Sequence, residues 1–205
     1  MYKIINRKKL FATIIADLVG NMIFAPSRLF RKKGEIKPDD VREILVIRTA
    51  YIGDVVMTIP ILRPLKERYP LAKISFLTST KAGEVLENNP YVDDIITFDP
   101  FWFYPSQINE YLKFIRRLKG KTFDLVIEAR GDIRELLFLV FPLNARFKVS
   151  YDVGGGGYFL THSVPYKALR HKVEYHLDIA RYLGCEINGV EWEIYLTDDE
   201  NKKAA

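Results

Sequence analysis

The chain has 205 residues, of which 48% are hydrophobic and 28% are charged. This size favours one complete domain with extra segments, and the composition excludes a disordered or collagen-like protein. The formal net charge is +5, but residues 1–40 hold nine Lys/Arg against four Asp/Glu, while residues 41–205 hold twenty-two of each. Because the body is electrically neutral, its composition does not indicate the basic surface of a nucleic-acid-binding domain, and we expect no nucleic-acid partner.

The first forty residues predict a basic amphipathic helix followed by a linker. An apolar stretch from Leu10 to Phe24 lies between two groups of Lys/Arg, and Asp17 and Asn21 interrupt it. A membrane-spanning helix needs roughly 20 apolar residues, and Asp17 also argues against a cleaved signal peptide. We expect residues 1–33 to lie on an anionic membrane surface, with packing on the protein body or on a partner as the alternative. Pro38 then marks the break that ends this region at residue 40.

From residue 41 the chain alternates between short apolar runs and longer segments of helical spacing, a pattern typical of parallel strands joined by crossover helices. The expected strands are residues 44–48, 73–78, 94–98, 123–128, 146–150 and 161–164. The expected helices are residues 54–69, 81–88, 105–119, 133–140 and 171–183. The pattern predicts an α/β, Rossmann-like three-layer domain with a parallel sheet over residues 41–184.

The loop after the first expected strand is the first candidate site, because ligands of open parallel sheets bind beyond the carboxyl ends of the strands. It runs from Arg48 to Asp54, and Gly53 permits a close turn. A carboxylate at a helix start stays ionised and can act as a base, so Asp54 is the candidate catalytic residue. The alternative is that Asp54 only caps the helix. The loop lacks the glycine spacing of dinucleotide and phosphate motifs.

The loop after the fourth expected strand, residues 128–134, is the second candidate. Arg130 and Arg134 could hold phosphate or carboxylate groups of a substrate through bidentate contacts. Glu128 and Asp132 could equally neutralise the two arginines in a surface network. Both interpretations stay open.

Two further segments are ambiguous. Four glycines at 154–157 match no phosphate motif by spacing and predict a flexible loop, which could close over a substrate. The aromatic stretch 98–104 predicts either a packed loop or a rim that stacks on sugar rings or lipid.

The histidines and the single cysteine predict no metal site and no disulfide. His162, His171 and His176 are nine and five residues apart, which does not place them on one helical face, and no metal is expected. Cys185 cannot form an intrachain disulfide, favours a reducing compartment, and is expected to be a buried residue near a helix end.

Several of these segments together resemble glycosyltransferase family 9, which includes the lipopolysaccharide heptosyltransferases. The resemblance covers most of residues 43–184, in order and at family-like spacing. It is carried by residues 43–48, 52–62, 65–70, 89–93, 123–128, 157–161, 171–174 and 183–184.

The resemblance implies a GT-B architecture in which this chain supplies the N-terminal, acceptor-binding half. It implies inverting transfer of a sugar from a nucleotide-sugar such as ADP-heptose to a lipopolysaccharide or other glycolipid acceptor, without cofactor or essential metal. The family's Gly-Asp aspartate, its general base, matches Asp54. The expected substrate contacts come from the following residues: Thr49, Gly53, Arg130, Arg134, Gly156 and Gly157.

The family's donor-binding domain has no counterpart in the sequence. Residues 185–205 are expected to form only the connection toward it, and the chain is expected to be inactive by itself. The resemblance implies a cytoplasmic location, peripheral on the inner face of the bacterial membrane. Ala129-Arg130-Gly131 stands where family members often have a Gln-Gly pair, which leaves the acceptor open. The alternatives are a non-catalytic acceptor-binding or scaffold module and a small flavodoxin-like nucleotide-binding protein, against which the absent phosphate motifs count.

Overall fold

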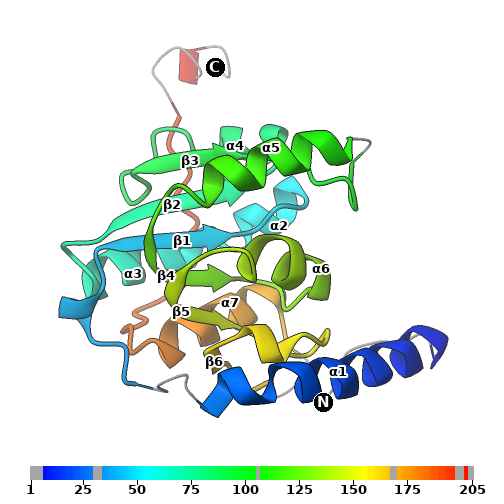
Figure 1. Cartoon of the computed structure of the whole chain (residues 1–205). Helices are drawn as coiled ribbons and strands as arrows, with labels where there is room; N and C mark the ends of the chain where they lie inside the picture. The colour runs from blue at the N-terminus through cyan, green and yellow to red at the C-terminus, as the bar shows by residue number, and fades with distance from the viewer. Residues whose placement is uncertain (1–6, 30–33, 105–106, 167–169, 197–200, 203–205) are drawn as a thin grey trace.

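The core of the protein is a six-stranded sheet in which every neighbouring pair is parallel (Figure 1). The computed structural model describes residues 7–29, 34–104, 107–166, 170–196 and 201–202. The strands are β1 (Glu43–Ile47), β2 (Lys73–Thr78), β3 (Asp94–Thr97), β4 (Phe123–Glu128), β5 (Ala145–Ser150) and β6 (His162–Ser163). Their order, β3-β2-β1-β4-β5-β6, reverses direction between β1 and β4. This reversal is the switch point at which ligands of such sheets bind, and the predicted α/β fold with a parallel sheet is confirmed.

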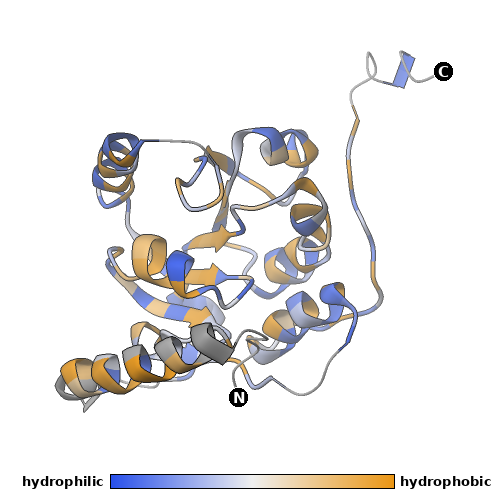
Figure 2. Ribbon diagram, turned by 90° about the vertical axis from the view of Figure 1, so that its right-hand side faces the viewer, coloured by the Kyte–Doolittle hydropathy of each residue, from blue (hydrophilic) through white to orange (hydrophobic). Residues whose placement is uncertain are grey.

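Helices cover both faces of the sheet (Figure 2). They are α1 (Arg7–Leu29), α2 (Ile52–Val56), α3 (Leu62–Arg68), α4 (Thr80–Gly83), α5 (Ile108–Leu118), α6 (Ile133–Glu135) and α7 (Lys172–Tyr182). One core cluster contains Ile44 and Val46 together with residues of α3 and α7, and the other contains Leu45 and Ile47 together with residues of α5. Because β1 is buried on both faces, its sequence is a continuous apolar run instead of an alternating one.

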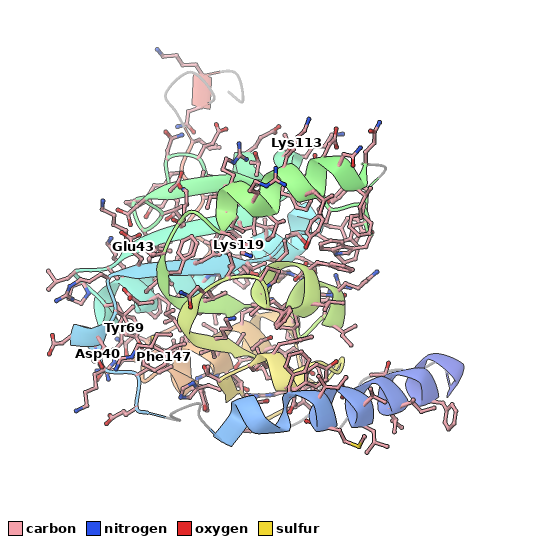
Figure 3. All side chains as sticks on the ribbon, viewed as in Figure 1. Asp40, Glu43, Tyr69, Lys113, Lys119 and Phe147 are labelled. Carbon is pink, nitrogen blue, oxygen red and sulfur yellow. The ribbon has the colours of Figure 1, made fainter. Side chains whose placement is uncertain are left out.

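The labelled side chains in Figure 3 show this layering. Tyr69 and Phe147 are buried in the cluster that includes α3 and α7. Lys113 lies on the exposed side of α5, at the opposite end of the molecule from α1, and exposed Lys119 follows the last residue of this helix (Figure 3). The protein therefore has a long N-terminal helix along one end and an amphipathic helix at the other.

The strands were predicted to within two residues, but three of the helices differ. The expected helix 54–69 is wrong as one element, because Pro60 lacks an N–H and the chain forms α2, a 3₁₀ turn η2 (Ile59–Ile61) and α3. The expected helix 81–88 is α4 plus a 3₁₀ turn, η3 (Glu84–Leu86). The expected helix 133–140 continues from α6 as a π-helix, η4 (Leu136–Val140). Residues 105–106 of the expected helix 105–119 lie outside the described residues.

Helix α1 packs on the body through its small and polar side. Asp17 is buried and accepts a 2.8 Å hydrogen bond from the N–H of Gly156. Gly20 lies against the ring of Tyr158, where a Cβ atom would be 2.3 Å from the nearest ring carbon. Phe24 stacks on the same tyrosine at 5.4 Å between ring centroids. The side of α1 that carries Asp17, Gly20 and Phe24 therefore packs on the protein body, as the alternative prediction for this helix states.

The four-glycine loop, for which the sequence predicts flexibility, is packed against this helix. Gly155 and Gly156 are buried with φ angles of +89° and +80°, and Gly157 begins the 3₁₀ turn η5 (Gly157–Phe159). Glycine is required there because a side chain at Gly155 would meet Thr13 of α1 at 2.7 Å. Over the described residues, no helix is both long and apolar enough to cross a membrane.

Candidate active site

A cavity of about 670 Å³ opens at the carboxyl ends of β1 and β4. It is lined by Arg48 and Asp54 after β1, by residues 129–134 after β4, by Tyr151 after β5 and by the start of α7. The two loops selected from the sequence therefore meet in one cavity, because the carboxyl ends of parallel strands share one edge of the sheet.

Asp54 is held between two cations. Its Oδ2 lies 2.7 Å from Nη2 of Arg48, and its Oδ1 lies 2.7 Å from Nζ of Lys172 on α7. The cap of α2 is Tyr51, and Asp54 occupies the first turn without a capping bond between side chain and backbone in the described region. The capping alternative for Asp54 is wrong, since the carboxylate points to the two cations.

The environment keeps Asp54 ionised. Burial alone would raise the pKa of this carboxyl group, but the hydrogen bond from Lys172 and the charge of Arg48 outweigh it, and the pKa is lowered. The Arg48 side chain is 4% exposed and Asp54 12%, whereas Lys172 is 67% exposed. Arg48 is therefore the fixed partner of the carboxylate, and Lys172 is the partner that can leave it.

Arg130 and Arg134 both line the cavity and share Asp132. Asp132 caps α6 by accepting the N–H of Arg134 at 2.9 Å, and it binds the same guanidinium at 3.0 and 2.7 Å. The Nε atom of Arg130 lies 3.6 Å from Asp132. Both guanidinium groups lie over the ring of Phe103, at 5.0 and 4.5 Å from its centroid. Asp132 thus neutralises only part of the charge, and this group of three side chains keeps one net positive charge at the cavity.

Glu128 does not take part in that network. It is fully buried and accepts hydrogen bonds from the N–H groups of Gly131 at 2.6 Å and Arg130 at 3.1 Å, and from the hydroxyl of Ser150. Burial, together with the charge of the nearby buried Glu135, raises the pKa of Glu128 well above its usual value. Through its bonds to the backbone, Glu128 supports the turn at Gly131, whose φ is +75°.

The other predicted site residues lie beside the cavity. The hydroxyl of Thr49 is buried and donates to Glu135, so Thr49 supports the wall. Gly53 is exposed on α2, and no described atom lies within 4 Å of where its Cβ would be. Its contact with substrate stays a prediction. Gly156 and Gly157 are not among the described residues that line the cavity, whereas Gly154 is.

Sequence reasoning missed Arg48, Lys172 and His176 as members of the site. His176 is 4% exposed, lines the cavity, and has no partner for Nδ1 among the described residues. Burial and the charge of Arg48 lower its pKa to about 3, so the imidazole is neutral. In the sequence, the spacing of His176 from His171 bears only on a metal site and does not indicate a place in this cavity. The described residues contain no cluster of three or more metal-ligating side chains.

A group of aromatic side chains lies next to the guanidinium groups of the cavity. The ring of Phe103 lies under Arg130 and Arg134, and the ring of Tyr51, which is 58% exposed, lies 6.2 Å from that of Phe103. Trp102 stacks on Phe138 at 5.2 Å. Residues 101–104 are half-buried, so the segment is a packed loop, and stacking on sugar rings or lipid stays a prediction.

The chain is similar to known proteins in both sequence and structure. Lipopolysaccharide heptosyltransferase 3 of Escherichia coli K12 is 31% identical over 147 residues, which is 65% of this chain and 40% of that protein. A crystal structure of the glycosyl transferase family 9 from Veillonella parvula superposes with a TM-score of 0.68 at 21% identity, over 83% of this chain and 49% of the other. The chain is related to the glycosyltransferase family 9 heptosyltransferases. No family model matches the sequence.

The structural match to this family includes an enzyme with a bound donor analogue. E. coli heptosyltransferase WaaC with ADP-2-deoxy-2-fluoro heptose superposes with a TM-score of 0.62 at 19% identity, over 74% of this chain and 51% of that one. The chain spans about half the length of the family 9 proteins that it matches. A chloroplast protein of Arabidopsis thaliana, photosynthetic NDH subunit of subcomplex B 1, is 28% identical over 113 residues, 55% of this chain and 24% of that protein.

Proposed function

We propose that this chain is the acceptor-binding half of an inverting glycosyltransferase and that Asp54 is its general base. The sugar would come from a nucleotide-sugar such as ADP-heptose and would be transferred to a lipopolysaccharide or other glycolipid. The observation that carries the proposal is the Asp54 carboxylate, which is ionised, nearly buried and placed in the switch-point cavity.

The reaction needs a carboxylate at this position. As an acceptor hydroxyl oxygen attacks the anomeric carbon, Asp54 takes the hydroxyl proton, a bond forms between that oxygen and the sugar, and the nucleoside diphosphate leaves with its bonding electron pair. Arg48 holds the carboxylate in place throughout, because it is buried beside it. Donor binding is assigned to a second domain, and no step in this half requires a cofactor or metal.

Lys172 sets the strength of the base. While its ammonium group contacts Oδ1, the carboxylate is ionised but weakly basic. An acceptor hydroxyl that hydrogen-bonds to Oδ1 replaces Lys172, whose exposed side chain can move away. The pKa of Asp54 then rises toward its ordinary value, which makes proton removal easier.

The rest of the cavity suits a phosphorylated sugar acceptor. Arg130 and Arg134 supply the surplus positive charge in the cavity. Outside the cavity lining, exposed Tyr51 lies 6.2 Å from the ring of Phe103 and offers a ring face on which a sugar can stack. Such an acceptor agrees with a cytoplasmic protein held peripherally at the inner face of a bacterial membrane.

The test is sugar transfer from ADP-heptose to a lipopolysaccharide-core acceptor. It compares a protein in which this chain is joined to a donor-binding half, its Asp54→Asn form, and the 205-residue chain alone. We expect the Asn form to lose about 10²–10⁴-fold in kcat with folding intact, and the chain alone to be inactive. Full activity in the Asn form would remove Asp54 from the mechanism.

A non-catalytic binding module is the second candidate, favoured by the likeness to a protein named as a subunit of an NDH complex. It predicts acceptor binding that is insensitive to Asp54→Asn and no transfer by any form. Isothermal titration with a core oligosaccharide, alongside the transfer assay, separates the two functions.

A further inference from the structure

Helix α1 presents its apolar side to solvent and its polar side to the protein. Thr13, Asp17, Gly20 and Phe24 form the stripe that meets the body. On the opposite side the exposed apolar residues recur every three or four positions, with exposed fractions of 44–68%: Phe11, Ile14, Ile15, Leu18, Val19, Met22 and Ile23. A helix packed on a soluble domain normally buries its apolar stripe, so this orientation requires a partner outside the described chain.

From this orientation we infer that α1 is a membrane-docking helix, whose apolar side enters an anionic bilayer and whose polar side forms part of the cavity wall. The stripe from Phe11 to Met22 is about 17 Å long at 1.5 Å per residue, which suits a helix lying in the interface plane. Figure 2 shows α1 as a largely apolar helix at the periphery of the body.

The charge of the N-terminal region favours a membrane over a second copy of the chain as the partner that covers the apolar side of α1. Residues 1–33 contain eight Lys/Arg, four on each side of the apolar stretch, and a single acidic residue, Asp17. Asp17 is buried and bound to Gly156, so its carboxylate is engaged with the protein body. Two copies facing each other would bring these basic ends together in either orientation, whereas anionic lipid headgroups attract both ends.

The same helix touches the candidate active site. Thr13 lines the cavity, and the glycine loop held by Asp17 contributes Gly154 to it. A helix with its side chains is about 10 Å across, so docking places the rim of the cavity within about that distance of the bilayer surface. The functional meaning of this placement rests on the proposed function: a lipid-linked acceptor could reach Asp54 while its lipid stays in the membrane.

Flotation with vesicles tests the docking step on the 205-residue chain. The variant Phe11→Ser/Leu18→Ser/Met22→Ser removes the stripe, and the matched control Leu71→Ser/Ile108→Ser/Leu112→Ser removes three comparably exposed apolar residues elsewhere. We expect the wild type and the control to bind vesicles containing phosphatidylglycerol, weakly at high salt, and the stripe variant to bind at least about thirtyfold less well. Far-UV circular dichroism verifies that both variants fold.

Two results would overturn the inference. One is equal vesicle binding by the stripe variant and the wild type. The other is no binding by the wild type together with a concentration-dependent dimer that the stripe variant loses, which would make this face a contact between copies.

Energy transfer to a labelled lipid headgroup tests the placement of the cavity. A dye at exposed Asp152→Cys, beside the glycine loop, should transfer more efficiently than one at exposed Lys113→Cys on α5. Equal transfer would contradict the orientation. Neither measurement involves a sugar donor, so failure of docking leaves the transferase proposal standing, and failure of transfer leaves docking standing.

Discussion

The buried histidine in the cavity makes a quantitative prediction about stability and pH. The pKa of His176 in the folded chain is about 3, because of burial and the neighbouring charge of Arg48, against an ordinary value of 6.5. As the pH falls below 6.5, the unfolded chain binds a proton at this position and the folded chain does not. The free energy of unfolding must therefore decrease from pH 6.5 downward, until the folded imidazole is protonated near pH 3.

The size of the effect follows from the two pKa values. Between pH 6.5 and 4.5 the contribution of His176 amounts to about 2 kcal/mol, since the folded imidazole stays neutral over that whole range. The variant His176→Gln lacks this contribution. Its absolute stability can differ for other reasons, so the quantity to compare is the change with pH.

Urea unfolding followed by far-UV circular dichroism at pH 6.5, 5.5 and 4.5 measures that change. His171→Gln is the matched control, because His171 is exposed at the start of the same helix. We expect the wild type and the control to lose about 2 kcal/mol more than His176→Gln over this interval. Equal pH dependence in all three proteins would refute the reasoning.

Three further predictions concern the walls of the cavity. Gly131→Ala should destabilise the protein by about 2–3 kcal/mol in urea unfolding, because φ is +75° and the new Cβ would lie 2.9 Å from Tyr151; an unchanged midpoint would contradict this. Gly53→Ala should leave stability equal or slightly higher, since its Cβ meets open space, yet lower the transfer rate if substrate contacts this backbone. Lys172→Ala should raise the pKa of Asp54, and so move the acid limb of the pH–rate profile to higher pH; an unmoved limb would separate Lys172 from the base.

The sheet could be predicted from sequence because burial on both faces leaves a strong local signal. The run Ile44–Ile47 is apolar at every position, and each residue has zero exposure in one or other of the two core clusters. The positions of Asp54 and Arg130 in the cavity could also be predicted, since each follows a strand at the edge of the sheet where ligands bind. Their order in the sequence relative to the strands was enough to place them at that edge.

The remaining site residues could not be predicted because their role depends on contacts between distant segments. Lys172 is 118 positions from Asp54, and nothing in its own sequence surroundings indicates that it bonds to that carboxylate. The inward side of α1 is a similar case. Asp17 reads locally as an interruption of an apolar stretch, and only the N–H of Gly156, 139 positions away, explains why it is buried.

The buried carboxyl groups of Glu128 and Glu135 have a consequence for how the cavity binds a ligand. Thr49 joins the loop after β1 to one carboxyl group, and Ser150 and Gly131 join the walls after β5 and β4 to the other. The backbone around the cavity is thus preorganised, so a ligand would lose little affinity to ordering of the walls. The entropy lost on binding would come mainly from long side chains at the rim, and calorimetry with a ligand of this cavity would show a small entropic penalty.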